Sequence, residues 1–303
     1  MGKHSNFIEK LKGYMMPFAM IIGFVFHQQV SELSFLIPYL IFVMLLFTYI
    51  KLSWKGVVFT KMHLWLLVFQ FVVSILVYAI ISPFNTILAQ GVLVCILAPT
   101  ATSAPVIAGM LRGNVLSLTG YSLMSNLLVV LVAPIIFSYI GYHQLPFLDS
   151  ATQISQKVFF LLVIPLLLSI IINRFTPKLG LFLKQKTQIS FYLWSIALMI
   201  VSGRTLEFVI AQGESNLLIE LILALFSLLI CVVQFWFGRR IGRKYDDTVA
   251  GGQGLGQKNT ILAIWMAQAY LNPISSIAPG AYVLWQNMIN SWQVWRSRKK
   301  NSI

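Results

Sequence analysis

The sequence predicts an all-α membrane protein with ten transmembrane helices, arranged as two inverted repeats of five helices each. Three observations support this fold class. Hydrophobic residues make up 58% of the 303-residue chain and charged residues only 10%, whereas soluble domains carry about 25% charged residues. The apolar segments are long enough to cross about 30 Å of hydrocarbon as helices. Finally, the basic residues gather on one side of these segments, which is the expected topology signal.

The apolar segments divide the chain into ten predicted helices. They span residues 13–29, 33–50, 63–82, 86–111, 115–140, 156–173, 188–203, 216–238, 247–270 and 276–295. Nineteen of the 22 Lys and Arg residues then fall on one side; Lys157 and Arg204 fall on the other, and Lys258 lies within a helix. This asymmetry predicts a multi-pass protein of the cytoplasmic membrane with both termini in the cytoplasm.

The net charge of +14 does not indicate a nucleic-acid partner. The basic residues lie in short loops between apolar segments, and no basic domain is present that would dock on a duplex. The expected partners are therefore the lipid bilayer and a small-molecule substrate. No cofactor is predicted.

The two halves of the chain carry similar numbers of helices. The loop around His143 divides the sequence into residues 1–145, with helices one to five, and residues 146–303, with helices six to ten. Because each half has an odd number of helices, the second half enters the membrane with opposite polarity. Inverted repeats of this kind are common in secondary transporters.

The fourth and the ninth helix are interrupted at corresponding positions of the two halves. Residues 98–105, with Pro99 and Pro105, interrupt the fourth helix, and residues 251–260, with a glycine run, interrupt the ninth. Proline removes a backbone donor and glycine loosens the helix. Unwound backbone within a bilayer is tolerated only where protein buries it or where it lines a wet cavity. Two matched breaks therefore favour a binding site over two kinked, closely packed helices.

Lys258 is an ionisable residue inside the ninth predicted helix. Such residues are costly in a membrane and usually serve a function, although a lysine near a helix end can also snorkel to the interface. Gln253, Gln257, Asn259 and Thr260 surround it, and the eight acidic residues lie at predicted helix ends or in loops. A site that is neutral to positive predicts an anionic substrate.

At the two interrupted segments the sequence resembles the bile acid:sodium symporter family. The stretch from Cys95 to Ser103 and the Leu111–Asn114 exit are similar to the family's fourth helix. Gln70-Phe71 resembles a Gln-Phe pair whose Gln contributes to a sodium site, and Gln253–Gln257 resembles the family's ninth helix. The resemblance implies a six-helix core domain, in which the two broken helices cross, beside a four-helix panel domain, each drawn from both repeats.

The sequence departs from the family at its sodium sites. Gln253 stands where the resemblance implies a glutamate, and Ala104-Pro105 where it implies Ser-Asn. Ser122 stands for a threonine ligand and keeps its hydroxyl. Lys258 takes the place of an asparagine, unless it is an insertion and Asn259 is the counterpart. Because sodium needs several oxygen ligands, we hypothesise that the Lys258 ammonium replaces the bound cation, and that its proton loss couples to transport.

The leading functional prediction is a secondary active transporter of small organic anions that works by alternating access, sodium-independent or proton-coupled. A conventional sodium-coupled symporter is the alternative. The predicted substrate or ion-binding residues are Gln70, Thr100, Thr102, Ser103, Ser122, Gln253, Gln257, Lys258 and Asn259. Of these, Gln70, Ser122, Gln253 and Gln257 are the residual sodium candidates.

Two other classes are weaker predictions. A membrane-embedded enzyme would need a nucleophile, metal ligands or paired carboxylates within the membrane. The four histidines are scattered near predicted helix ends without metal-ligand spacing, and we interpret them as interfacial residues. A channel or a sensor is disfavoured because a single site at paired breaks suits stepwise carriage.

Overall fold

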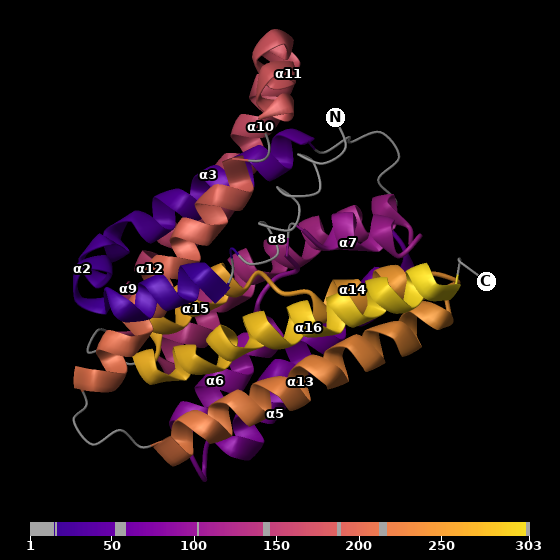
Figure 1. Ribbon diagram of the computed structural model, residues 1–303. Coiled ribbons are helices and arrows are strands. Elements are labelled where there is room, and N and C mark those ends of the chain that lie inside the picture. The colour runs from indigo at the N-terminus through magenta and orange to yellow at the C-terminus, as the bar shows by residue number, and fades with distance from the viewer. Residues whose placement is uncertain are drawn as a thin grey trace. The chain divides into compact units, whose positions relative to one another are not determined.

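The described part of the chain is all-helical, which confirms the predicted class (Figure 1). A computed structural model describes residues 15, 17–51, 59–101, 103–141, 146–186, 189–211 and 217–300. Within these ranges the only β-type pairing is an isolated bridge between Thr100 and Lys258. The ten-helix inverted repeat remains a prediction.

Six helices of the described residues are long and apolar enough to cross a membrane. They are His27–Lys51, Lys61–Ile81, Val115–Ile140, Phe147–Phe175, Ile189–Ala211 and Leu217–Arg243. The remaining predicted segments differ from these for particular reasons. The first begins among residues that are not described, the fourth and ninth are split into short helices, and the tenth carries many polar side chains.

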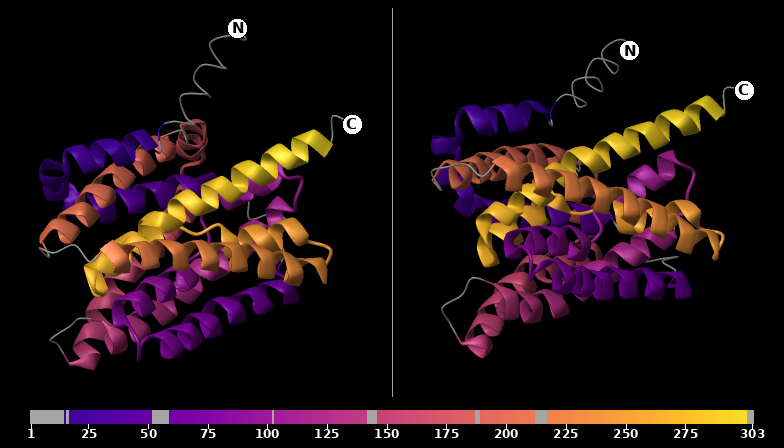
Figure 2. Two further views of the ribbon diagram at one scale, coloured as in Figure 1. Left: turned by 60° about the horizontal axis from the view of Figure 1, so that its bottom comes forward. Right: turned by 90° about the horizontal axis from the view of Figure 1, so that it is seen from below.

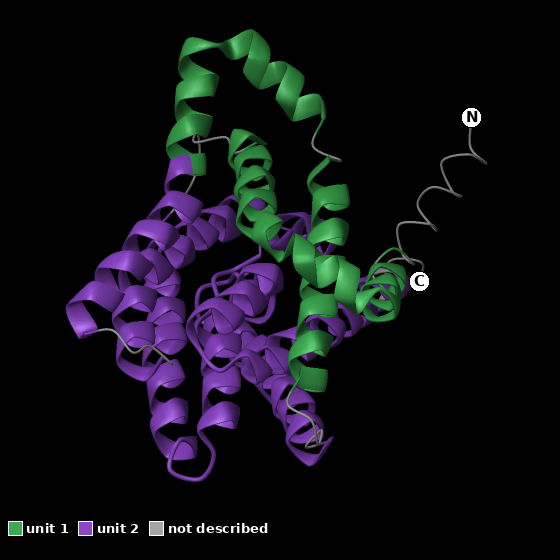
Figure 3. Ribbon diagram, turned by 90° about the vertical axis from the view of Figure 1, so that its left-hand side faces the viewer, with its two compact units in different colours: residues 1–51, 165–215 green, residues 52–164, 216–303 purple. Residues whose placement is uncertain are grey.

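The chain forms two compact units, each built from two separate stretches (Figure 3). The first unit comprises residues 1–51 and 165–215, and the second comprises residues 52–164 and 216–303. The first unit contains a helix over residues 17–25 and the elements α2 (His27–Glu32), α3 (Ile37–Lys51), most of α10 (Ile164–Phe175), α11 (Pro177–Gln185) and α12 (Ile189–Ala211). Helix α12 packs against both α2 and α3.

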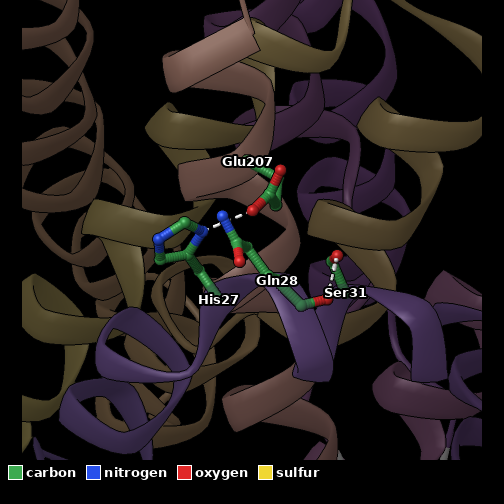
Figure 4. A network of polar contacts seen from close by, with 4 residues as sticks. All are labelled: His27, Gln28, Ser31 and Glu207. Atoms are coloured by element: carbon green, nitrogen blue, oxygen red, sulfur yellow. Dashed lines mark hydrogen bonds and ion pairs between the residues drawn. The ribbon is translucent and has the colours of Figure 1, made fainter.

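A polar contact joins α2 to α12 in the first unit (Figure 4). The Nδ1 atom of His27 contacts Oε1 of Glu207, and nearby the hydroxyl of Ser31 donates to the carbonyl of Gln28. The predicted seventh helix ended at residue 203 and left Glu207 in a loop, which is wrong because α12 continues to Ala211. His27 thus links α2 to α12 through its contact with Glu207.

The second unit contains the elements that position the candidate site. They are α4 (Lys61–Val68), a π-helical segment (Phe69–Val73), α5 (Ser74–Ile81), α6 (Thr86–Leu97), α7 (Ala104–Met110), α8 (Val115–Ile140), α9 (Phe147–Leu162), α13 (Leu217–Arg243), α14 (Thr248–Gly256), α15 (Thr260–Tyr270), a 3₁₀ turn (Pro273–Ser276) and α16 (Ile277–Lys300). Asparagine side chains accept backbone N–H groups at the starts of four of these elements, as N-caps do. These residues are Asn85, Asn114, Asn259 and Asn272.

Some predicted helix boundaries are wrong because amphipathic helices extend into segments that were predicted as loops. The sixth helix was predicted over residues 156–173, but α9 begins at Phe147, because Ile154, Val158 and Leu161 bury one face while polar residues cover the other. Helix α11 lies in a segment predicted as a loop. Both cases show that a polar surface face hides a helix from a search for uniformly apolar segments.

Helices α13 and α14 pack closely because glycines face each other across them. Figure 2 shows the chain turning back after α13, so that α14 runs alongside it. A Cβ atom on Gly238 would lie 2.3 Å from the carbonyl oxygen of Gly251, and one on Gly251 would lie 2.4 Å from that of Gly238. Real Cβ atoms do not approach backbone so closely, and only glycine fits.

We therefore expect Gly251→Ala to destabilise the protein by about 2 kcal/mol, because the added methyl group overpacks two backbones that cannot both move aside. Gly280→Ala in α16 is the matched control, since its Cβ would meet nothing within 4 Å. Thermal unfolding in detergent measures both variants. Equal melting temperatures for the two would contradict the predicted packing.

Candidate functional site

The fourth and ninth predicted helices are interrupted, and the two interruptions lie side by side. Helix α6 ends at Leu97 and α7 begins at Ala104, while α14 ends at Gly256 and α15 begins at Thr260. The glycine run predicted to unwind is instead helical, so the second break is only Gln257–Asn259. Glycine permits a helix as well as a break, and here it makes room for neighbours: a Cβ on Gly256 would lie 2.3 Å from the Phe235 ring.

The two breaks are paired through their backbones as a short antiparallel ladder. The N–H of Ala101 donates to the carbonyl of Gln257, and the N–H of Asn259 donates to the carbonyl of Pro99, both at 2.8 Å. Thr100 and Lys258 are the opposed residues of this bridge. The ladder satisfies polar backbone groups that helices would otherwise have satisfied. We call the paired segments 98–101 and 257–259 the crossing.

Lys258 is buried at the crossing with only 1% of its surface exposed. Its Nζ atom donates to the carbonyl oxygens of Ile96 (2.8 Å) and Ala98 (2.9 Å), at the carboxyl end of α6. Its backbone N–H donates to Oε1 of Gln286 (2.9 Å). No carboxylate lies within ion-pair distance of Lys258 in the described chain. A helix carboxyl end carries partial negative charge, so the ammonium lies where a cation is stabilised.

Gln70, in the π-helical segment, also bonds to the carboxyl end of α6. Its Nε2 atom donates to the carbonyls of Leu97 (2.7 Å) and Ala98 (3.1 Å). Its Oε1 atom accepts from the hydroxyls of Tyr121 (3.0 Å) and Ser125 (2.9 Å) on α8. Gln70 belongs to the π-helical segment, and segments of this kind often mark functional positions. Its side chain therefore makes four hydrogen bonds while fully buried.

Buried side chains donate hydrogen bonds to carbonyls at the carboxyl ends of both broken helices. On α6, the Nε2 atom of Gln234 reaches the carbonyl of Cys95 at 3.2 Å. On α14, the Thr100 hydroxyl donates to the carbonyl of Gly254 (2.8 Å), and the Tyr282 hydroxyl donates to that of Gly256 (2.9 Å). Helix ends buried away from water require such partners. The crossing is thus held by residues of four other helical elements, namely the π-helical segment, α8, α13 and α16.

A chain of amides extends from the crossing along α16. The Nε2 atom of Gln257 donates to the hydroxyl of Ser103 (3.3 Å), and its Oε1 atom accepts from Nδ2 of Asn290. The Nε2 atom of Gln253 donates to Oδ1 of Asn290 (3.0 Å) and to Oε1 of Gln293 (3.2 Å). The Oε1 atom of Gln253 is buried with no hydrogen-bond partner in the described structure. This oxygen is available to a donor or to a cation.

The predicted site residues thus differ in their roles. Gln70, Thr100, Ser103, Gln253, Gln257 and Lys258 belong to one hydrogen-bonded assembly. Asn259 pairs its backbone with Pro99 and caps α15 through its side chain, which accepts the N–H of Leu262 at 3.3 Å. Ser122 is buried, but within the described network only its carbonyl takes part, accepting from Asn126. Thr102 lies outside the described residues.

Sequence reasoning missed the residues of α16 and α13 that complete the assembly. Gln286, Asn290 and Gln293 are buried and face the crossing. Their spacing of four and three residues places them on one face of a helix, and this polar stripe in a predicted membrane helix was the available signal. Gln234 was equally visible as a lone amide within the apolar α13.

Of the histidines, His63 also makes specific polar contacts in the second unit. His63 is fully buried, its Nδ1 atom accepts the N–H of Thr60 (3.3 Å), and its Nε2 atom contacts the hydroxyl of Ser117 at 3.0 Å. It forms part of a capping box at the start of α4. Within the described ranges no three His, Cys, Asp or Glu residues gather as metal ligands. The side chains that bond at the crossing supply amides, hydroxyls and one ammonium, and their partners are mostly main-chain carbonyls.

Comparison with models of known protein families gave no match, and no curated protein matched the chain.

Proposed function

We propose that this protein is a secondary active transporter of small organic anions, a divergent relative of the bile acid:sodium symporters, in which Lys258 replaces a bound cation. The single observation that carries the proposal is the position of the Lys258 ammonium. It is buried at a crossing of two broken helices and bonded to carbonyls at a helix end. Its charge has no carboxylate partner in the described chain.

The chemistry of the crossing supports an anionic substrate. A buried positive charge without a counter-ion makes its surroundings favourable for an anion, because charges interact more strongly in a medium of low dielectric than in water. The ammonium itself is hydrogen-bonded to two carbonyls, so it would act on a substrate through its fixed positive charge rather than by direct contact. Direct contacts with substrate would come from groups near it, such as Ser103, which is exposed and bonded to Gln257.

The experiment is uptake of labelled organic acids by liposomes that contain the purified protein. We expect wild-type uptake in the absence of sodium, with acceleration by an imposed proton gradient if proton loss from Lys258 is coupled to transport. A counterflow signal is also expected, because a carrier exchanges labelled for unlabelled substrate and a channel does not. Absence of uptake and of counterflow for every tested organic acid would contradict the proposal.

A second candidate, a conventional sodium-coupled symporter, is favoured by one observation. The buried Oε1 atom of Gln253 has no partner in the described structure and lies in an assembly rich in oxygen atoms. Such oxygens are ligands that sodium accepts. Strict sodium dependence of wild-type uptake would establish this candidate in place of the first.

A further inference from the structure

We propose that the second unit carries a binding site for an anionic phospholipid, formed by an apolar groove between α13 and α16 and by the arginines at the carboxyl ends of these two helices. The site is separate from the crossing and does not depend on the transport function. Its occupant has two chemically distinct parts, an acyl chain and a negatively charged headgroup, and each part has a matching surface.

The groove matches the acyl chain. It has a volume of about 290 Å³ and is lined only by apolar and aromatic residues, namely Leu228, Trp285, Met288, Ile289 and Trp292. Helix packing holds its walls in place, because the indole N–H of Trp285 donates to the carbonyl of Ala224 and to the hydroxyl of Ser227, both at 3.1 Å. A concave apolar surface on two predicted membrane helices is a place for a hydrocarbon chain.

The basic cluster matches the headgroup and is continuous with the groove. The Arg296 guanidinium lies 5.3 Å from the ring centre of Trp292, which is itself a groove residue. Arg239 lies close enough to Arg243 and Arg296 for their charges to act on it. Its side-chain stem packs over Gly252 of α14, where a Cβ atom would lie 2.5 Å from Cγ of Arg239. This packing fixes the half-buried guanidinium rather than leaving it to move freely in solvent.

The cluster has an excess of positive charge. Arg240 and Lys299 stack on Trp236 and Trp295 at 5.7 and 5.5 Å, which adds two cations held by aromatic rings at the same helix ends. Helices α13 and α16 run in the same direction, so these ends lie together (Figure 1). Asp246 and Asp247 follow in the next turn of chain, but within the described residues neither forms an ion pair with the arginines.

The combination distinguishes a specific site from general attraction to a membrane. Basic residues next to membrane helices attract anionic leaflets wherever they occur. Here three arginines converge from two helices, and one of them rests on the aromatic wall of an apolar groove. This geometry would hold the phosphate and one chain of a single lipid at the same time.

The test is native mass spectrometry of the purified full chain in detergent, with phosphatidylglycerol and phosphatidylcholine of equal chain length added at equal concentration. We expect the wild type to retain phosphatidylglycerol preferentially. Arg296→Gln and the Arg239→Gln/Arg296→Gln double variant should lose that preference by about fivefold for each arginine removed. The single variant keeps the test valid if loss of the half-buried Arg239 impairs folding, because Arg296 is exposed.

The matched control is Lys178→Gln/Lys184→Gln, which removes the same charge from the exposed face of α11 in the first unit. It should retain the wild-type preference. The proposal would be overturned if the wild type retained both lipids equally. It would also be overturned if the control variant lost its preference for phosphatidylglycerol as strongly as the arginine variants do. Inorganic phosphate that displaces phosphatidylglycerol at low concentration would also overturn it, since the groove would then contribute nothing.

Discussion

Replacing Lys258 by methionine is expected to abolish sodium-independent uptake while leaving the protein folded. Methionine fills nearly the same volume but has no charge and no donor. The carbonyl of Ile96 then loses its Lys258 partner, which costs about 1–3 kcal/mol, whereas the carbonyl of Ala98 keeps its bond from Gln70. Removing a buried ammonium also removes its desolvation cost, so the main effect should appear in transport rather than in stability.

Liposome uptake and thermal unfolding, measured on the same preparations, separate these effects. Lys157→Met is the matched control, because Lys157 is exposed on α9. Wild-type uptake by Lys258→Met in sodium-free buffer would disprove the role of Lys258 as a built-in cation. The mechanism also predicts a rescue: Lys258→Asn combined with Gln253→Glu should restore uptake that now requires sodium, because the double variant exchanges the fixed cation for a carboxylate ligand.

Replacing Gln70 by leucine should give the largest loss of stability. The change takes the Gln70 amide away from the carbonyl of Leu97 and from the hydroxyls of Tyr121 and Ser125, of which Ser125 still accepts the N–H of Thr100. Each buried polar group that loses its partner costs about 1–3 kcal/mol. We therefore expect the free energy of unfolding to fall by about 3 kcal/mol or more. Gln28→Leu removes an amide from an exposed position and is the control.

The change in stability is measured by thermal unfolding in detergent, with the fraction of protein that stays monodisperse as the readout. A melting temperature of Gln70→Leu that equals that of Gln28→Leu would show that the four hydrogen bonds of Gln70 contribute no net stability. It would also show that the broken end of α6 has another route to satisfy its carbonyls, such as water.

Helix ends were predictable where a residue's own backbone chemistry determines them, as it does for proline. Pro99 predicted the end of α6, and Pro105 lies in the first turn of α7, where its missing donor costs nothing. The glycine run of α14 misled the prediction, because glycine is permissive and the neighbouring helix decides whether it unwinds. Gly251 and Gly256 are helical since α13 packs directly against them.

The candidate site was predictable only in part, for a related reason. Lys258 was identified because a charge in an apolar segment is conspicuous, and Gln70 and Gln253 were identified through a family resemblance. The hydrogen-bond partners of Lys258 could not be identified from the sequence, because they are the main-chain carbonyls of Ile96 and Ala98 and every residue has a carbonyl. Which carbonyls lie beside the ammonium follows from the crossing, and tertiary structure alone determines it.

The antiparallel ladder at the crossing has a consequence for sequence divergence. Its two hydrogen bonds join main-chain atoms of Ala101 to Gln257 and of Asn259 to Pro99, so they survive almost any exchange of side chains. Pro99 contributes only its carbonyl, the one hydrogen-bonding group that proline retains. The joint between the two broken helices can therefore persist while the polar groups around it are replaced. Evolution can change the side chains around the crossing without rebuilding the scaffold that holds them.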